Sequence, residues 1–100
     1  SSKEGFDSPR DRHNMSFFVY MIISKINNRY ISYVGYTNNL KNRVRLHNSS
    51  KGAKFTKGNH WKLIYTKKYL KKSIAMKNEY KLKKDRKLRN KIKYNYINSI

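Results

Sequence analysis

Two side chains that can bind an anion or move a proton lie one helical turn apart near the middle of the chain. Arg43 carries a guanidinium and His47 an imidazole, and both fall in the sequence YVGYTNNLKNRVRLH, residues 33–47. Residues four apart share one face of a helix. Leu40 and Val44 have the same spacing and form an adjoining apolar stripe. A polar pair at the border of a buried helix face is typical of a functional site, although a single helix histidine is more often a surface residue.

A β-hairpin is expected to lead into this helix. Residues 17–23, FFVYMII, have the aromatic and β-branched side chains of a strand, and residues 29–36 return as a second strand. The pair Asn27-Asn28 between them suits a tight turn, because asparagine tolerates positive φ.

The register of the hairpin decides where two tyrosines point. If the strands are symmetric about the turn, Tyr20 lies opposite Gly35 and Tyr33 opposite Ile22. Side chains alternate along a strand, so Tyr20 and Tyr33 would then project from the same face. A slip of one residue would separate them. Taken singly, a strand tyrosine is usually a core residue with a hydrated hydroxyl.

Four further elements complete the expected fold. They are a helix with Asn38 or Asn39 as N-cap that ends near Asn48, a strand over residues 61–66 with Trp61 in the core, a helix capped by Ser73 that ends near Lys84, and a last basic helix beyond Asp85 with Leu88 and Ile92 inward. The predicted class is α+β, an α/β sandwich in which a small, mainly antiparallel three-stranded sheet is flanked by helices in the order β-β-α-β-α-α.

One carboxylate is expected to face the interior. Glu79 falls in the apolar arc of its helix, on the same side as Ala75 and Leu82. Burial of a carboxylate is costly unless a cation or hydrogen bonds meet it. Glu79 is therefore either half of a structural ion pair, for instance with Arg43, or a ligand for Mg²⁺, the hard cation that accompanies phosphate substrates.

A lysine-rich segment, SSKGAKFTKGNH, occupies residues 49–60. It has the composition of a mobile surface loop. It equally suits contact with nucleic acid, in which Lys51, Lys54 and Lys57 follow a phosphate backbone and Phe55 stacks on a base. Both interpretations remain open at this point.

The charge of the chain is strongly lopsided. Twenty-five Lys and Arg face five Asp and Glu, which gives a formal net charge of +20. Such a chain favours a polyanionic partner, and nucleic acid is the first candidate. An A/T-rich gene would also enrich lysine, but it does not account for so few acids.

The length of 100 residues suits one small domain. Residues 1–14 are polar and aperiodic, so we expect a flexible leader or an expression remnant there, with Met15 as a candidate native start and a single domain over residues 15–100. The absence of cysteine excludes disulfides and thiolate metal sites. The longest apolar run, residues 17–23, is too short to span a bilayer, and no signal peptide is recognisable. We therefore expect an intracellular protein with no membrane partner, in the cytoplasm, nucleus or nucleoid.

Taken together, these motifs resemble the GIY-YIG nuclease superfamily over roughly residues 17–84. The resemblance lies in Val19-Tyr20-Met21, Tyr33-Val34-Gly35, an arginine ten residues after Tyr33, a histidine four further on, and the later inward Glu79. The chain is similar to the small stand-alone bacterial proteins of the UvrC-like (YhbQ) type. The segment HNSSKGAKFTKGNHWKLIY also resembles the nuclease domains of structure-selective resolvases. Phe18 and Val19 replace the Gly and Ile of the first motif, where they mainly support the strand.

The resemblance implies a catalytic role for five residues. Tyr20 would activate the attacking water, with help from Tyr33 or His47. Arg43 would clamp the scissile phosphate, because its planar fork suits two oxygens. Glu79 would hold a single divalent ion, Mg²⁺ or Mn²⁺. A free tyrosine has a pKa of about 10, so a neighbouring cation or a metal-bound water would have to make it a better base.

Two further assignments follow from the same resemblance. Gly35 would be structural, at a point where the backbone approaches another group. Many members also use an asparagine late in the domain, and Asn90 and Asn95 both compete for that position.

Two classes of function fit these observations. The first is a metal-dependent DNA endonuclease, with branched, nicked or flap DNA as candidate substrates because so small a domain can read little sequence. The second is a nucleic-acid-binding module of the same fold that is inactive or needs an accessory protein. Retention of Tyr20, Arg43 and Glu79 favours the nuclease. An RNA target is a third and weaker alternative.

Overall fold

The computed structural model describes residues 16–49 and 58–100. Its first two strands, β1 (Phe17–Ile26) and β2 (Arg29–Thr37), form an antiparallel hairpin. Asn27 and Asn28 make the turn with φ values of 52° and 66°. Two consecutive residues with positive φ match the right-handed twist of the flanking strands, which is why asparagine is favoured there.

The predicted hairpin register is confirmed. Tyr20 pairs with Gly35, and Ile22 pairs with Tyr33. Tyr20 and Ile22 are two residues apart on β1 and so project from the same face, and Tyr33 shares that face because it is paired with Ile22.

The third strand, β3 (Lys62–Tyr69), pairs antiparallel with β1 and gives the strand order β2-β1-β3. Its pairing shifts between Met21, which faces Tyr65, and Ile22, which faces Leu63. One extra residue on β3 at that point is a β-bulge, which bends the edge strand. The strand runs three residues beyond the predicted end because its pairing with β1 continues to Phe17 and Tyr69.

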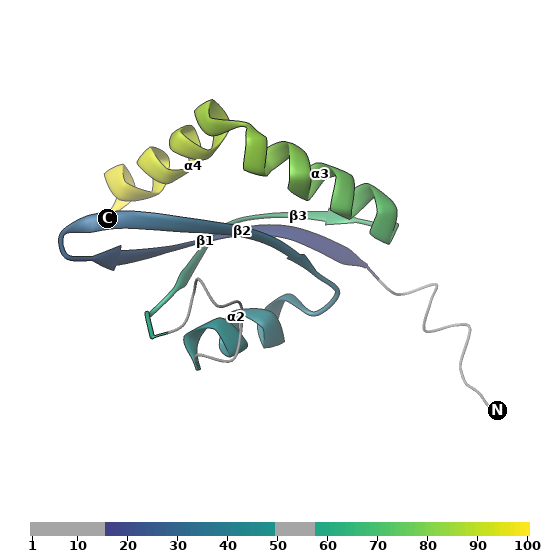
Figure 1. Cartoon of the computed structure of the whole chain (residues 1–100), viewed down its shortest axis with the longest axis horizontal. Helices are drawn as coiled ribbons and strands as arrows, with labels where there is room; N and C mark the ends of the chain where they lie inside the picture. Colours follow the sequence, from purple (N-terminus) through teal and green to yellow (C-terminus); the bar gives the residue numbers. More distant parts are fainter. Residues whose placement is uncertain (1–15, 50–57) are drawn as a thin grey trace.

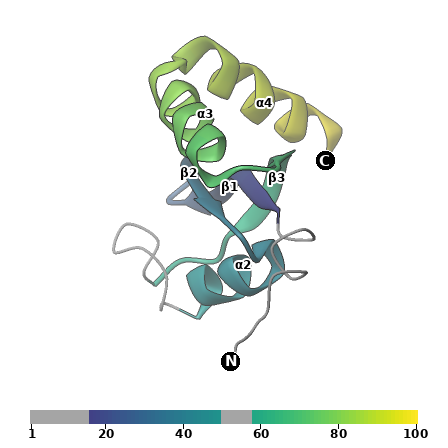
Figure 2. The same ribbon diagram turned by 90° about the vertical axis from the view of Figure 1, so that its right-hand side faces the viewer.

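Helices cover both faces of the sheet. Helix α2 (Leu40–Asn48) lies on one face, whereas α3 (Lys72–Lys84) and α4 (Arg86–Ser99) lie on the other, as the two perpendicular views show (Figures 1 and 2). The α+β class and the order β-β-α-β-α-α are therefore confirmed.

The caps of these helices were predicted only in part. Asn39 caps α2, where its side chain accepts a hydrogen bond from the backbone N–H of Asn42 at 3.1 Å. The prediction that Ser73 caps α3 is wrong: the helix already begins at Lys72, and its N-cap residue, Lys71, makes no side-chain cap hydrogen bond. Helix α4 does have a side-chain cap, because the Asp85 carboxylate accepts a hydrogen bond from the backbone N–H of Leu88.

The alternation of β1 divides the core into two layers. On the α3 face, Val19 and Met21 pack with Val34, Ala75 and Leu82. On the α2 face, the buried side chains are Tyr20, Ile22 and Trp61, with Ile31, Tyr33, Leu40 and Val44 packed against them.

Three predictions about burial can be compared with this core. Trp61 is only 2% exposed, which confirms it as a core residue. Ile92 packs against the α3-face layer. Leu88 was expected to face inward, but its side chain is 40% exposed. It lies in the first turn of α4, immediately after the chain has left α3.

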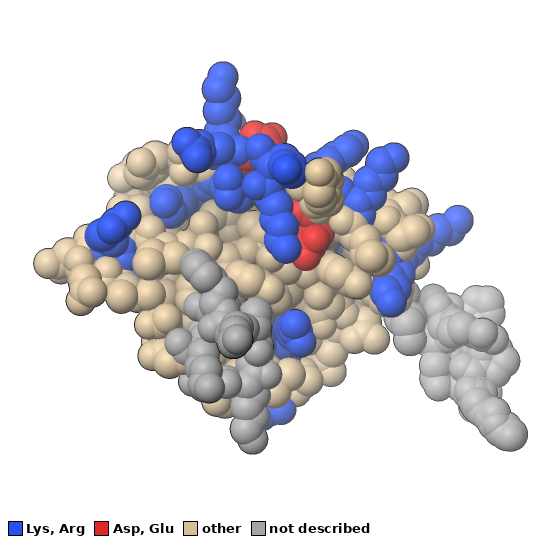
Figure 3. Space-filling view, in the orientation of Figure 1, with Lys and Arg blue, Asp and Glu red and all other residues tan. Residues whose placement is uncertain are grey.

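The surface over α3 and α4 carries many Lys and Arg side chains (Figure 3). Among the helices of the described ranges, none has the length and apolar character needed to span a membrane.

Candidate active site

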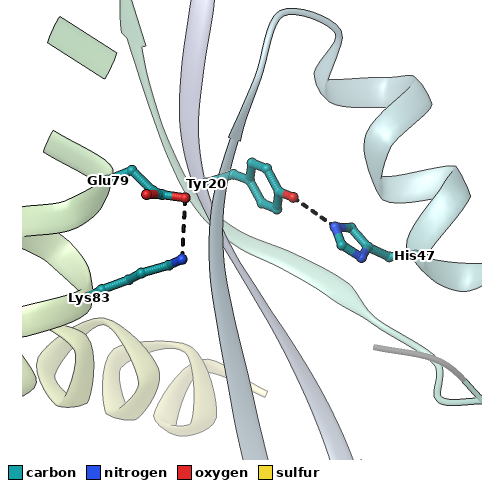
Figure 4. A network of polar contacts seen from close by, with 4 residues as sticks. All are labelled: Tyr20, His47, Glu79 and Lys83. Atoms are coloured by element: carbon teal, nitrogen blue, oxygen red, sulfur yellow. Dashed lines mark hydrogen bonds and ion pairs between the residues drawn. The ribbon is translucent and has the colours of Figure 1, made fainter. Parts of the chain in front are cut away.

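The site is built around a contact between β1 and α2. The Tyr20 hydroxyl lies 2.7 Å from Nε2 of His47. Both side chains are buried, with exposed fractions of 1% and 0%. Figure 4 shows Tyr20 pointing from the sheet toward the helix that carries His47. His47 is therefore a buried partner of the first-motif tyrosine and not a surface residue.

The second motif tyrosine joins this contact through its ring. The centroid of Tyr33 lies 5.2 Å from that of His47, and the centroid of Tyr20 lies 5.8 Å from it, with both rings tilted against the imidazole. Tilted packing at such distances is favourable for aromatic rings. His47 thus contacts both tyrosines, which the hairpin register places on one face.

Burial governs the protonation of the pair. It raises the pKa of the Tyr20 hydroxyl to about 12, and hydrogen bonding from Arg43 opposes this rise without cancelling it. Burial, and then the charge of Arg43, lowers the pKa of His47 below its ordinary 6.5. Both groups are therefore neutral at pH 7. Arg43 can only donate to the Tyr20 oxygen, so the Tyr20 hydroxyl proton is free to be donated to Nε2 of His47.

Gly35 is required by the position of the Tyr20 ring. A Cβ at residue 35 would lie 2.6 Å from the Tyr20 hydroxyl oxygen and 2.8 Å from Cζ. Both separations are shorter than side chains tolerate without a shift of the ring. The structural role expected for this glycine thus has a geometric cause: the ring lies directly against the backbone of β2.

Arg43 lies beside Tyr20, and one of its N–H donors is not used within the described residues. Its Nε is buried and has no hydrogen-bond partner among the described residues. Buried polar nitrogens are nearly always paired in folded proteins. Besides its hydrogen bond to Tyr20, the guanidinium therefore keeps a buried donor that a bound group or a water could satisfy.

Glu79 occupies a different place from the other four predicted residues. It lies on α3, on the opposite face of the sheet from His47, and its side chain is 17% exposed (Figure 4). Its carboxylate pairs with Lys83 at 3.5 Å, so the ion pair considered with Arg43 is not the one formed. Its charge still raises the pKa of Tyr20, but it is the smallest of the influences on that group.

The donor set at Glu79 fits Mg²⁺ better than a metal with many protein ligands. No cluster of three or more His, Cys, Asp or Glu exists within residues 16–49 and 58–100. Mg²⁺ commonly uses one or two carboxylates and completes its shell with waters and substrate phosphate. A single, largely buried carboxylate is compatible with that mode of binding.

Asn48 is a further residue of this region, which the sequence did not single out. Its side-chain amide donates to the carbonyl of Trp61 at 3.0 Å, and its oxygen accepts from the N–H of the same residue. The two hydrogen bonds join the end of α2 to the start of β3. An asparagine at a helix end gives no signal of such a distant partner, because the partner depends on how the intervening segment returns.

The remaining predicted residues do not join the cluster in the described structure. Lys51, Lys54, Phe55 and Lys57 lie outside the described residues. Asn90 is half-buried and Asn95 exposed, both on α4 across the sheet from α2. Neither asparagine is hydrogen-bonded through its side chain to any residue that the structure describes.

The chain is similar to a family model and to proteins of other organisms. The family model described as the GIY-YIG catalytic domain matches residues 16–95. A UPF0213 protein of Oceanobacillus iheyensis is 48% identical over 52 residues, which are 51% of this chain and 60% of that protein. A UPF0213 protein of Staphylococcus haemolyticus is 40% identical over 67 residues, 66% of this chain and 78% of that protein. The match to the Oceanobacillus protein thus spans less than two thirds of its length.

One solved structure is also similar. It is the solution NMR structure of a UPF0213 protein from Bacillus halodurans, which is 32% identical, with a TM-score of 0.43. The match covers 78% of this chain and 82% of that one.

Proposed function

Because the chain belongs to the family of GIY-YIG catalytic domains, whose model matches residues 16–95, we propose that it is a metal-dependent DNA endonuclease that hydrolyses phosphodiester bonds. The observation that carries this proposal is the buried hydrogen bond between Tyr20 and His47, with Arg43 beside it. A neutral imidazole, a phenol and a guanidinium in one cluster supply a proton acceptor, a proton carrier and a phosphate clamp.

Tyr20 and His47 act as a proton relay in this proposal. The attacking water gives a proton to the Tyr20 oxygen as the Tyr20 hydroxyl proton passes to Nε2 of His47. As the water oxygen forms the new bond to phosphorus, the bond to the 3′ oxygen breaks, and the departing 3′ oxyanion takes a proton from solvent. A relay is supported because the pKa of Tyr20, about 12, keeps the free phenol protonated at neutral pH.

Arg43 binds the scissile phosphate and prepares His47 for its role. Its planar donors suit two phosphate oxygens. The charge of Arg43 is one of the two causes that lower the pKa of His47. When the negative phosphate lies against Arg43, this repulsion is offset and His47 accepts a proton more readily. Substrate binding and base strength are thus coupled through one side chain.

Glu79 would hold the divalent ion, Mg²⁺ or Mn²⁺. The ion, when bound, would stabilise negative charge on the phosphate and on the leaving oxygen. To bind the ion, the carboxylate of Glu79 would release Lys83, whose side chain is 48% exposed and can move into solvent.

DNA is the proposed substrate on the basis of family and charge. A net charge of +20 suits a dense polyanion, and the Lys and Arg side chains over α3 and α4 add non-specific attraction (Figure 3). A domain of this size offers little surface to read a long sequence, so we propose that it recognises shape, as in branched, nicked or flap DNA.

A second function is favoured by two specific observations. Tyr20 is 1% exposed, and Glu79 is already paired with Lys83. Both features suit a nucleic-acid-binding module that cuts only with an accessory protein, or not at all.

One experiment separates the two functions. Supercoiled plasmid and labelled branched, nicked and flap DNA are incubated with the protein and Mg²⁺ or Mn²⁺, beside Glu79→Ala at matched DNA affinity. The nuclease proposal predicts cleavage by the unchanged protein and binding without cleavage by the variant. Tight binding without cleavage by both would support the binding module.

A further inference from the structure

A groove of about 500 Å³ opens at the end of the β1–β2 hairpin where the chain passes into α2. Its volume lies within the range of about 300–1,000 Å³ typical of small-molecule sites. The residues that line it are Phe17, Tyr36, Thr37, Asn38, Arg43 and Lys72. They come from both sides of the sheet, because Arg43 belongs to α2 and Lys72 to the first turn of α3.

The charge of this groove is uncompensated within the described residues. Its lining contains two cations and no acid. Lys72 forms no ion pair with any residue of the described ranges. Arg43 keeps a buried Nε without a hydrogen-bond partner among the same residues. Two cations that converge on one groove without a counter-charge favour an anion with more than one negative group.

The rest of the lining favours a nucleotide over a bare ion. Phe17 and Tyr36 are half-buried aromatic residues that line the groove. Aromatic faces beside cations are the usual surroundings of a nucleic-acid strand, where a base or sugar packs on the ring and the phosphate meets the cation.

We propose that this groove is a second phosphate subsite, in which Lys72 binds the phosphate next to the one that Arg43 holds. The inference rests on the proposed function in one respect, the assignment of Arg43 to the scissile phosphate. It adds Lys72, a residue of α3 that belongs to none of the family's motifs. It also implies the path of a bound nucleic-acid strand across the protein, from Arg43 on α2, past the end of the β1–β2 hairpin, to Lys72 on α3.

Other lysines on α3 provide the comparison. Lys77 is exposed on the same helix but does not line the groove. If Lys72 were an ordinary solvated lysine, its removal and the removal of Lys77 would have the same small effect on any anion.

The test uses small probes and requires neither metal nor cleavage. Thymidine 3′,5′-bisphosphate carries two phosphates spaced by one nucleoside, and thymidine 5′-monophosphate carries one. Each is titrated into the full chain by NMR, and the backbone spectrum of each variant reports its folding. The proposal predicts that Lys72→Ala weakens bisphosphate binding roughly five-fold, that Lys77→Ala weakens it less than two-fold, and that Lys72→Arg restores it. Binding of the monophosphate should change less than two-fold in Lys72→Ala.

The inference is overturned if Lys72→Ala and Lys77→Ala weaken the bisphosphate equally, or if the unchanged protein binds the bisphosphate no more tightly than the monophosphate. These results are independent of the nuclease proposal. A protein that never cuts DNA but shows the predicted loss in Lys72→Ala retains the subsite and loses the endonuclease assignment. A protein that cuts DNA without that loss retains the endonuclease assignment and loses the subsite.

Discussion

The Tyr20 hydroxyl and Nε2 of His47 lie 2.7 Å apart in the interior, although 27 residues separate them in the chain. The contact joins the central strand to the helix on one face of the sheet. It also places a phenol and an imidazole where neither is ionised at neutral pH. One hydrogen bond therefore serves both the packing of α2 and the proposed chemistry.

Stability should fall as the pH drops below 6.5, because the pKa of His47 is lowered from its ordinary 6.5 in the folded protein. The unfolded chain then binds this proton more readily than the folded one. The resulting stabilisation is complete above pH 6.5 and is lost as the pH falls toward the folded pKa. Urea unfolding between pH 5 and pH 8 measures it. His47→Gln should remove this part of the slope, whereas His60→Gln, a change at an exposed histidine, should keep it. Equal slopes in both variants would contradict the assignment.

A methyl group at residue 35 should disturb the Tyr20–His47 contact. In Gly35→Ala the new Cβ meets the Tyr20 oxygen at 2.6 Å unless the ring moves. We expect a loss of about 1–3 kcal/mol in the free energy of unfolding and a change in the NMR signal of the His47 imidazole. The same substitution in a Tyr20→Leu background should cost clearly less, because the ring that it strikes is gone. Equal costs in both backgrounds would show that the ring is not the cause.

The hairpin shows what local sequence can determine. Asn27 and Asn28 fix the turn, and the turn fixes the register, so the shared face of Tyr20 and Tyr33 follows from residue types alone. The N-cap Asn39 belongs to the same class of local signal.

The partners of side chains depend on tertiary packing, and here the sequence was less informative. The inward position of Glu79 follows from helical spacing, but its pairing with Lys83 instead of Arg43 depends on which face of the sheet each helix covers. The burial of His47 also depends on tertiary packing. Tyr20 contacts His47 only because α2 packs on the core layer that Tyr20, Ile22 and Trp61 form. Ser73 was an incorrect cap because α3 begins at Lys72, before the residue with the best capping side chain.

Asn48 should contribute to stability through its two hydrogen bonds to the backbone of Trp61. Asn48→Ala leaves that N–H and carbonyl without these partners, and we expect the free energy of unfolding to fall by about 1–3 kcal/mol. Chemical denaturation measures the change. Asn42→Ala is the matched control, because the side chain of Asn42 only accepts a hydrogen bond from Arg45 on the exposed surface of α2, and its backbone N–H keeps the cap from Asn39. A cost no larger than that of Asn42→Ala would contradict the role of Asn48.

Removal of Lys83 should increase the affinity for divalent metal. Lys83 pairs with Glu79 at 3.5 Å and would therefore compete with the divalent ion that we propose for that carboxylate. An exposed pair of this spacing on a helix is worth about 0.3–0.5 kcal/mol, so Lys83→Gln should tighten Mn²⁺ binding roughly two-fold. Electron paramagnetic resonance of free Mn²⁺ measures it without DNA. Lys84→Gln makes the same charge change beside Tyr80 instead of Glu79 and should have a smaller effect. If Lys84→Gln tightens binding as much as Lys83→Gln does, general charge and not the ion pair is responsible.

The most direct test of the proposed function is the single-turnover cleavage rate of Tyr20→Phe, with protein in excess over the DNA that the unchanged protein cuts best. Loss of the hydroxyl removes the proton carrier between water and His47, and general acid–base catalysis contributes about 10²–10⁴-fold to a rate. Tyr30→Phe, which removes the hydroxyl of another half-buried tyrosine in the hairpin, is the control. We predict that Tyr20→Phe binds the DNA as the unchanged protein does but cuts it at least about 100-fold more slowly, while Tyr30→Phe cuts normally. Cleavage by Tyr20→Phe within about two-fold of the unchanged rate would contradict the relay through Tyr20 and His47.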